Sequence, residues 1–414
     1  MAGSDTQNPV VIVGGGIGGV SLAGALRARG HLGGIVLIDE AEFPYDRPPL
    51  SKAFLAGERT LKEIALQSAE WYAEQDISLL APARVAAITP GDDSVRVDLA
   101  EGDPLEASHV VLATGGQAVL PPIPGLAETT ETGRVHTLRE HRDAERLRTA
   151  LTPGARLLVI GAGLIGAEVA STAVGLGCSV VLADPADPPL AAAGLDVARW
   201  LHGLHRVHGA ETVGTTVESL CPTEAGIQAQ LGDEEAPRVF DAVLVGVGIA
   251  PRTQLAEAAD LEVDRGVLVD EFHRTSHPRV LAIGDVARTR GPDGHRSEHW
   301  DAAKRDGERA AATILEAPAP TAVAPWWWSD RHGLHVEGIG EMVPDARQVV
   351  RGQVGQPPFT TFAVDGARVL GAVAVDDPQA IRAARRLIER GIEVDPDRLA
   401  DPATDLRKLL RGTP

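Results

Sequence analysis

The segment Val10-Val-Ile-Val-Gly14-Gly-Gly16-Ile-Gly-Gly19 is the strongest indication of the fold of this chain. Its four apolar residues predict a buried strand, its glycines predict a tight turn, and the residues after them predict a helix. In such a strand-turn-helix unit the glycines let the backbone approach a pyrophosphate, and the helix N-terminus offers free N–H groups to the anion. The stretch therefore predicts a dinucleotide-binding fold.

A second fingerprint, Leu157-Leu-Val-Ile-Gly161-Ala-Gly163-Leu-Ile-Gly166, repeats this pattern further along the chain. Each repeat also carries an acid at the end of its second strand, Asp39 or Glu40 in the first and Asp184 in the second. An acid about 20 residues beyond the glycines binds the hydroxyls of a ribose. One fingerprint alone is weak evidence. Two of them in register with an acid predict two dinucleotides, typical of a flavin and a nicotinamide that exchange a hydride.

The length of 414 residues predicts two or three domains, and a hydrophobic fraction of 44% is typical of a globular protein. The net charge of −19 argues against nucleic acid or an anionic membrane as a partner, because both attract positive charge. The sequence has neither an apolar run of about 18 residues nor an apolar segment close to Met1. We therefore expect a soluble, cytoplasmic protein.

The order of these patterns predicts an α/β chain with two Rossmann-like dinucleotide-binding domains, one for FAD and one for NAD, followed by a C-terminal α+β domain. Apolar strands at 109–115 and 242–248 close the two repeats, and a strand at 280–284 delivers Asp285 at its C-terminal end. The run Glu316-Ala-Pro-Ala-Pro-Thr predicts a linker. The predicted domains are a discontinuous FAD domain (1–115 and 248–322), an NAD domain (116–247) and a C-terminal domain (323–414).

The cysteines exclude the ordinary disulfide reductases. Cys178 and Cys221 are far apart in the sequence, and neither belongs to a Cys-x-x-Cys pair. Electrons must therefore leave a flavin directly or through a separate carrier. His202, His205 and His208 recur at helical spacing, but without an acidic or cysteine ligand motif they predict a solvated helix face and no metal site.

Five short motifs lie outside the fingerprints: Pro44-Tyr-Asp-Arg-Pro-Pro-Leu-Ser-Lys52, Ala113-Thr-Gly-Gly116, Gly284-Asp285, Glu298-His-Trp300 and Pro325-Trp-Trp-Trp-Ser-Asp330. Together they resemble the FAD-dependent NADH:ferredoxin reductases of bacterial oxygenase systems, the putidaredoxin reductase type, which have a glutathione-reductase-like fold. The resemblance implies an enzyme that passes a hydride from NADH to FAD. It also implies that single electrons then pass to a [2Fe–2S] ferredoxin, which feeds an oxygenase, either a cytochrome P450 or a ring-hydroxylating dioxygenase.

The same resemblance implies roles for individual residues. Lys52 is expected at the reactive edge of the flavin, paired with Glu168 beside the nicotinamide, so these two are the expected catalytic residues. Asp285 is expected at the ribityl chain and Arg47 against FAD. The full set of expected cofactor contacts is Gly14, Gly16, Gly19, Asp39, Glu40, Arg47, Lys52, Val85, Ala113, Thr114, Gly115, Gly161, Gly163, Ile165, Gly166, Glu168, Asp184, Gly248, Asp285, Trp300 and Trp328.

Each of these roles has a plainer structural alternative. A lysine after a Pro-Pro loop is equally typical of a solvated side chain, Asp285 of a helix cap, and Glu168 of an acid that complements a helix dipole. The tryptophans are equally typical of a core. In a strand, Trp326 and Trp328 would share one face.

The run Asp184-Pro-Ala-Asp-Pro-Pro-Leu190 contains no basic residue. A 2′-phosphate there would meet carboxylates and no guanidinium, which favours NADH over NADPH. In the first repeat either Asp39 or Glu40 is expected to bind the ribose hydroxyls, because many members of the resembled family have glycine where Asp39 stands.

Rival functions share these motifs. An NADH oxidase or a rubredoxin reductase would have the same sequence features, and an NADH-switched flavoprotein with a binding or signalling role, akin to apoptosis-inducing factor, is a rival from a different class. A monomer or a homodimer is expected. For an acidic ferredoxin, Lys304, Arg305 and Arg309 form one candidate docking patch.

Overall fold

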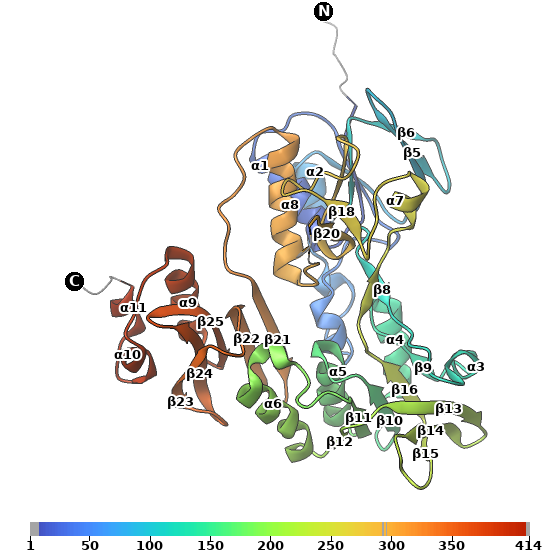
Figure 1. The fold of residues 1–414 in the computed structure, drawn as a ribbon. Helices are drawn as coiled ribbons and strands as arrows, with labels where there is room; N and C mark the ends of the chain where they lie inside the picture. Colours follow the sequence, from blue (N-terminus) through green and yellow to red (C-terminus); the bar gives the residue numbers. More distant parts are fainter. Residues whose placement is uncertain (1–7, 292–293, 295, 411–414) are drawn as a thin grey trace, which may run out of the picture. The chain divides into compact units, whose positions relative to one another are not determined.

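The first glycine fingerprint joins a parallel five-stranded sheet to a helix (Figure 1). The computed structural model describes residues 8–291, 294 and 296–410 of the chain. The strands of this sheet run in the order β19-β7-β1-β2-β3, with β1 at its centre. Their bounds are β1 (Val10–Val13), β2 (Ile35–Ile38), β3 (Ile77–Leu80), β7 (His109–Leu112) and β19 (Val280–Ala282).

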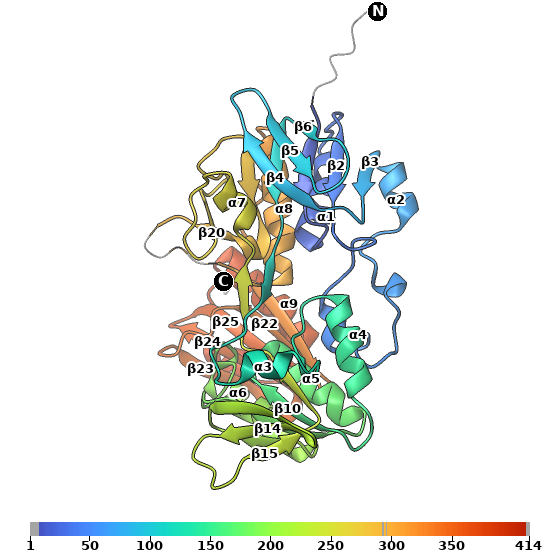
Figure 2. The ribbon, with the colours of Figure 1, turned by 90° about the vertical axis from the view of Figure 1, so that its right-hand side faces the viewer.

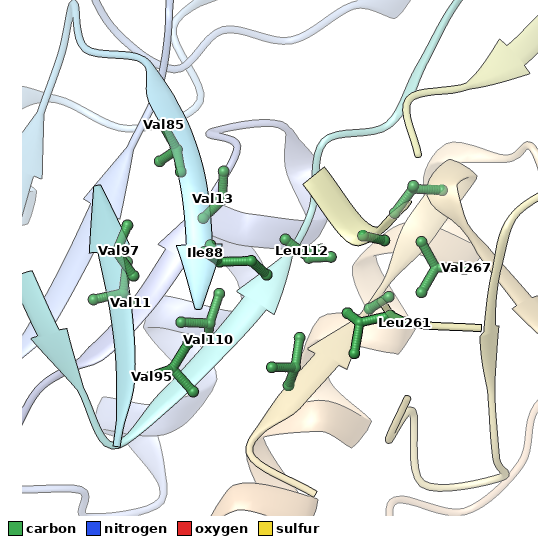
Figure 3. Packing of buried hydrophobic residues seen from close by; sticks show 14 of the residues in the cluster. Val11, Val13, Val85, Ile88, Val95, Val97, Val110, Leu112, Leu261 and Val267 are labelled. Carbon is green, nitrogen blue, oxygen red and sulfur yellow. The ribbon is translucent and has the colours of Figure 1, made fainter. Parts of the chain in front are cut away.

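Different layers cover the two faces of this sheet, because side chains along β1 alternate between them. Val10 and Ile12 pack in one core cluster with α1 (Ile17–Ala28) and α8 (Trp300–Ile314). Val11 and Val13 pack in another, with the antiparallel sheet β4 (Val85–Pro90), β5 (Val95–Leu99) and β6 (Leu105–Ala107) (Figure 3). The smaller elements of this part are α2 (Ala69–Glu74), α7 (Gln254–Ala258), β18 (Val267–Val269) and β20 (Ala287–Thr289).

The second fingerprint builds a sheet of the same plan, in the order β12-β11-β10-β16-β9. Its strands are β9 (Val135–His136), β10 (Arg156–Ile160), β11 (Ser179–Ala183), β12 (Glu211–Val213) and β16 (Ala242–Val245). Here too a three-stranded antiparallel sheet precedes the closing strand (Figure 2), made of β13 (Val217–Thr223), β14 (Gly226–Leu231) and β15 (Arg238–Phe240). The helices of this part are α3 (Leu126–Thr130), α4 (His141–Ala150), α5 (Leu164–Gly175) and α6 (Leu195–Val207). The two halves are therefore structural repeats, as the sequence predicts.

The C-terminal part is an antiparallel sheet in the order β21-β22-β25-β24-β23. Its bounds are β21 (Trp326–Arg331), β22 (Leu334–Gly340), β23 (Arg347–Gln353), β24 (Gln356–Asp365) and β25 (Arg368–Val375). One face packs against α9 (Pro378–Arg390) through Ala372 and Ala374, and the other packs against α6 through Val373 and Val375. The last two helices of the described residues are α10 (Pro396–Ala400) and α11 (Leu406–Leu409). The predicted fold class, two Rossmann-like domains and a C-terminal α+β domain, is confirmed.

Two compact units account for these parts. The first comprises the described residues of Met1–Arg47, Thr60–Gln117 and Ile249–Thr321, and the second comprises those of Pro48–Arg59, Ala118–Gly248 and Ala322–Pro414. β8 (Gly116–Ala118) and β17 (Ile249–Pro251) form a two-stranded sheet. The second unit holds both the second Rossmann sheet and the C-terminal sheet, so the domain boundaries given above stay predictions. Within residues 8–291 and 296–410, no helix is both long enough and apolar enough to cross a membrane.

Candidate functional site

The glycines of the first fingerprint are required by close backbone approaches. Gly14 has a φ of +115°, and a Cβ there would collide with the carbonyl group of Ala113. A Cβ on Gly19 would collide with the carbonyl oxygen of Gly14, so this glycine lets α1 pack against the turn. At Gly16, by contrast, an added Cβ would meet only the guanidinium of Arg47, at 2.9 Å. The second glycine thus lies on the side of the loop where a phosphate would approach.

The acid of each repeat is held by its own glycine loop. Asp39 Oδ2 accepts a hydrogen bond from the Gly15 N–H at 2.5 Å, and Asp184 Oδ2 accepts one from the Ala162 N–H at 2.7 Å. The Oδ1 atom of each acid accepts a second backbone N–H, two residues further along the chain. Glu40 instead has an exposed side chain that faces Arg84 at 3.6 Å. The internal repeat therefore pairs Asp39, rather than Glu40, with Asp184.

Arg47 provides an observation that fits a bound pyrophosphate. Its guanidinium lies beside Gly16 and 5.6 Å from the ring centroid of Tyr45, and its buried Nε has no hydrogen-bond partner among the described residues. A buried donor without a partner is costly, and a phosphate oxygen would satisfy it. This cation at the N-terminus of α1 fits the phosphates of a dinucleotide.

Two further residues predicted in the first unit, Thr114 and Asp285, lie just beyond the carboxyl ends of its strands. Thr114 follows β7 and donates its hydroxyl to the Arg252 carbonyl at 2.9 Å. Asp285 follows β19, and burial lowers the pKa of the adjacent His299 while Asp285 opposes that shift. Trp300 begins α8 and donates its indole N–H to Asp46 at 2.7 Å. Strand ends of this kind are where open α/β sheets bind ligands.

The second fingerprint repeats the steric pattern of the first. Gly161 has a φ of +97°, and a Cβ on Gly166 would collide with the Gly161 carbonyl oxygen, whereas Gly163 has open space around it. Beside this opening, Ile165 and Val247 are unusually exposed for large apolar residues, at 42% and 41%. Val247 is not among the cofactor contacts predicted from the sequence, although it directly precedes Gly248, which is. An exposed apolar pair beside an open glycine loop fits a flat aromatic ring.

Lys52 and Glu168 form an ion pair, with Lys52 Nζ 2.6 Å from Glu168 Oε2. Glu168 lies on α5 and only 3% of its side chain is exposed, against 20% for Lys52. Ser51 also donates to Glu168 Oε2, at 2.5 Å, and the Ser51 carbonyl accepts from Thr172 on α5 at 2.8 Å. The loop that carries Lys52 is thus fixed to the helix of the second fingerprint. Lys52 is therefore not the solvated side chain of the plainer interpretation. Glu168 lies beyond the first turn of α5, which contains no acidic residue, so it is not the first-turn acid of its own plainer interpretation.

Strand β21 has two chemically different faces. Trp326 and Trp328 stack at 4.8 Å between ring centroids, and Trp326 donates its indole N–H to Glu337 at 3.0 Å. The opposite face carries Trp327, which lies over Gly338, and Ser329, which donates to Glu168 Oε1 at 2.8 Å. The prediction that Trp326 and Trp328 share a face is confirmed. The contact of Ser329 was missed, because alternation assigns a face but not a partner.

Several predicted residues lie elsewhere than the sequence suggested. The Val85 side chain is buried in the core beside Val13 and Ile88 (Figure 3), so only its backbone is free to contact a nucleotide. Arg305 is bound to Asp301 at 2.6 Å, and Lys304 lies over the Trp300 ring at 5.9 Å. The predicted basic patch is therefore partly neutralised, because an acid one turn earlier on α8 takes up one of its charges.

The prediction of a solvated histidine face on α6 is wrong for His205, which is fully buried. Its Nδ1 is 2.9 Å from Nε2 of His332, at the tip of the β21–β22 hairpin, and His332 stacks on His208 with 4.3 Å between ring centroids. Burial and the nearby Arg331 charge lower the pKa of His205 to about 2, and burial and His208 lower that of His332 to about 4. This cluster holds the hairpin tip against α6.

These buried histidines predict acid lability. The unfolded chain binds protons below a pH of about 6.5, whereas folded His205 stays neutral down to a pKa of about 2, so its contribution is present above pH 6.5 and lost as pH falls. For His205 alone the loss at pH 5 is about 2 kcal/mol. The thermal unfolding midpoint should therefore drop between pH 7 and pH 5. His205→Gln should reduce that drop, and an equal drop in the variant would contradict the assignment.

Comparisons with known proteins agree with this geometry. The family model described as pyridine nucleotide-disulphide oxidoreductase matches residues 8–307, and the model described as reductase C-terminal matches residues 326–410. The chain is 37% identical to the ferredoxin–NAD(+) reductase component of the anthranilate 1,2-dioxygenase system of Burkholderia cepacia, covering 98% of this chain and 100% of that protein. It is 35% identical to putidaredoxin reductase of Pseudomonas putida, covering 98% and 97%.

A solved structure extends the likeness to three dimensions. The chain matches a chain of the covalent putidaredoxin reductase–putidaredoxin complex with a TM-score of 0.90 and 33% identity, over 98% of both chains. Cys178 is buried, Cys221 is exposed, and both are free thiols, so the disulphide of the family's description has no counterpart in these two residues. The chain therefore belongs to the pyridine nucleotide-disulphide oxidoreductase family, among the ferredoxin–NAD(+) reductases of bacterial oxygenase systems.

Proposed function

We propose that the protein is an FAD-dependent NADH:ferredoxin reductase, in which FAD takes a hydride from NADH and releases its electrons singly. The observation that carries this proposal is the pair of glycine loops, each with an acid bound to its backbone in the same way. Beside the first loop lies the buried Arg47 Nε, which has no hydrogen-bond partner in the described part of the chain. The helix after the second loop carries Glu168, which is paired with Lys52. These differences support FAD at the first loop and NADH at the second.

Residues of the first unit would hold FAD through both charge and hydrogen bonds. Arg47 and the N-terminus of α1 would bind the pyrophosphate, and Asp39 would accept hydrogen bonds from a ribose. Each Asp39 carboxylate oxygen has two lone pairs, of which the backbone N–H takes one. The carboxylate can therefore accept hydrogen bonds from the backbone and from the ribose hydroxyls at the same time. Asp285 would meet the polar chain that links the phosphates to the ring. Trp300, fixed by Asp46, would limit the space beside it.

Residues of the second unit would hold NADH and support hydride transfer. Asp184 would bind the ribose hydroxyls, and Ile165 and Val247 would pack against a flat ring. Glu168 would keep the Lys52 ammonium in one position between turnovers. A fixed positive charge favours the build-up of negative charge on a hydride acceptor, and it costs no reorganisation during the reaction.

A [2Fe–2S] ferredoxin is the electron acceptor that we propose, with a cytochrome P450 or a ring-hydroxylating dioxygenase as the final consumer. The relatives support this choice because their names specify ferredoxin and dioxygenase systems. The two free cysteines also support it, since neither is placed to relay electrons through a local dithiol. We place the reaction in the cytoplasm, where NADH is available, and we propose a monomer or homodimer.

Anaerobic addition of NADH to the purified holoprotein tests the proposed chemistry. We expect one equivalent of NADH to bleach the flavin absorbance of one bound FAD. In a parallel aerobic assay, consumption of O2 at the full steady-state rate without ferredoxin would favour the NADH oxidase instead. A long-lived reduced complex that transfers electrons neither to O2 nor to ferredoxin would favour the signalling flavoprotein.

Preference for NADH over NADPH is expected from Asp184, whose carboxylate would repel a 2′-phosphate. Asp184→Ala should raise the NADH KM more than it lowers kcat, with a loss of about 1–3 kcal/mol in kcat/KM for a hydrogen-bonding charged group. Steady-state kinetics with both nucleotides measure this. Glu218→Ala, an exposed acid on β13, is the matched control and should leave KM unchanged. Equal efficiency of NADH and NADPH in the unmodified protein would overturn the assignment.

A further inference from the structure

The Glu168 carboxylate accepts four hydrogen bonds, two on each oxygen. Oε2 accepts from Lys52 Nζ at 2.6 Å and from Ser51 Oγ at 2.5 Å. Oε1 accepts from Ser329 Oγ at 2.8 Å and from the Asp330 N–H at 3.3 Å. A carboxylate has about four lone-pair sites, so all of them are occupied. Glu168 is therefore fixed from both sides, once by the loop that carries Lys52 and once by β21.

The bond from Ser329 has a defined direction. Arg331 Nη2 donates to Ser329 Oγ at 2.9 Å, and a guanidinium can only donate. The Ser329 oxygen must therefore act as the acceptor for Arg331, which leaves its hydroxyl hydrogen for Glu168. Ser329 is 0% exposed and Arg331 is 4% exposed, so water does not compete for these bonds.

Removing the Arg331 guanidinium from water costs free energy in the folded protein. Its Nε has no hydrogen-bond partner among the described residues, and burial lowers its pKa while Glu168 and Asp330 oppose that shift. A methionine or leucine would fill the same space without this desolvation cost. A buried cation in this position points to a role other than stability.

We propose that Ser329 and Arg331 are positioning residues that hold Glu168, and through it the Lys52 ammonium, in the arrangement used for hydride transfer. This inference rests on the proposed function of the Lys52–Glu168 pair. Glu168 lies between two cation–serine pairs, Lys52 with Ser51 on one side and Arg331 with Ser329 on the other. The C-terminal sheet thereby contributes directly to the geometry of the pair.

The rate of flavin reduction in the holoprotein tests whether Ser329 and Arg331 position Glu168. Ser329→Ala should slow flavin reduction by NADH about tenfold, because misplacing a reacting group costs this much or more, while the KM for NADH changes little. Ser171→Ala is the matched control. Its hydroxyl accepts the His332 N–H at 2.7 Å, so it anchors the same hairpin to the same helix without touching Glu168. It should leave the rate within about twofold.

A double-mutant cycle separates an effect of Ser329 that acts through Glu168 from a general destabilisation of the structure. If Ser329 acts through Glu168, Ser329→Ala should add nothing in a Glu168→Gln background. Arg331→Met is expected to act in the same direction as Ser329→Ala, and Ser329→Ala remains decisive if Arg331→Met does not fold.

A spectroscopic readout checks positioning without any turnover. The chain has four lysines, Lys52, Lys62, Lys304 and Lys408, so labelling lysine Nζ with 15N gives a simple NMR spectrum. The Lys52 signal should move in Ser329→Ala and stay in place in Ser171→Ala. An unmoved signal with an unchanged rate in Ser329→Ala, while Lys52→Met still slows flavin reduction, would overturn this inference and leave the proposed function intact. Unchanged rates in Lys52→Met and Glu168→Gln would instead overturn the proposed role of the pair.

Discussion

Replacing Lys52 with methionine is expected to slow the reduction of bound FAD by NADH about 100-fold, the typical effect of removing one fixed group that stabilises developing charge. Methionine keeps a similar length and an apolar stem but removes the ammonium that Glu168 holds at 2.6 Å. Because the groups proposed to hold FAD, Asp39 on the first glycine loop and the Arg47 guanidinium, are unchanged in this variant, the FAD content should stay unchanged. Rapid mixing under anaerobic conditions measures the rate, and the absorbance spectrum measures the FAD content.

Two further variants make this result specific. Lys62→Met changes another lysine, in the short 3-10 turn Lys62–Ile64, and should reduce its FAD at the unmodified rate. Glu168→Gln should slow the same step as Lys52→Met, because the ammonium loses its buried partner. Hydride transfer at the original rate in both Lys52→Met and Glu168→Gln would mean that the ion pair is only structural.

Adding one methyl group to the third glycine of either fingerprint is expected to abolish binding at that fingerprint alone. The Cβ in Gly19→Ala would collide with the Gly14 carbonyl oxygen, and the protein should be purified without FAD. The Cβ in Gly166→Ala would collide with the Gly161 carbonyl oxygen, and the protein should keep FAD but fail to be reduced by NADH. Neither backbone carbonyl can move without opening the loop that forms the phosphate site.

Matched glycines on the same helices serve as controls. In α1, a Cβ on Gly24 would make an ordinary contact with Trp71 at 3.5 Å, and in α5 a Cβ on Gly175 would meet nothing within 4 Å. Gly24→Ala and Gly175→Ala should bind both nucleotides normally and gain slightly in stability from better helix propensity. Loss of FAD in Gly166→Ala with retention in Gly19→Ala would reverse the assignment of the two loops.

The sequence predicts the parts of this protein that local patterns encode. The glycine spacing and the acid at the end of the second strand define each nucleotide fold, and the internal repeat then separates Asp39 from Glu40 once the backbone is known. Alternation along β21 correctly assigns Trp326 and Trp328 to one face. These features depend on the periodicity of a strand or the conformational needs of a turn, which a single sequence carries.

The contacts that join distant segments could not be predicted in this way. Ser329 meets Glu168 across 161 positions, and no spacing rule links a hairpin of the C-terminal sheet to a helix of the second fold. The sequence predicts an exposed His205, because i, i+3 spacing describes a helix face without indicating what covers that face. In the structure that face is covered by the tip of the β21–β22 hairpin, which brings His332 to it.

In the proposed function, electrons from NADH leave this protein through a ferredoxin. We would test this route by measuring the anaerobic rate of cytochrome c reduction by NADH and the holoprotein, with and without a [2Fe–2S] ferredoxin from a bacterial oxygenase system. We expect a small rate without ferredoxin and a rate that rises with added ferredoxin until it saturates. A rate that is the same at every ferredoxin concentration would show that electrons do not leave through the ferredoxin.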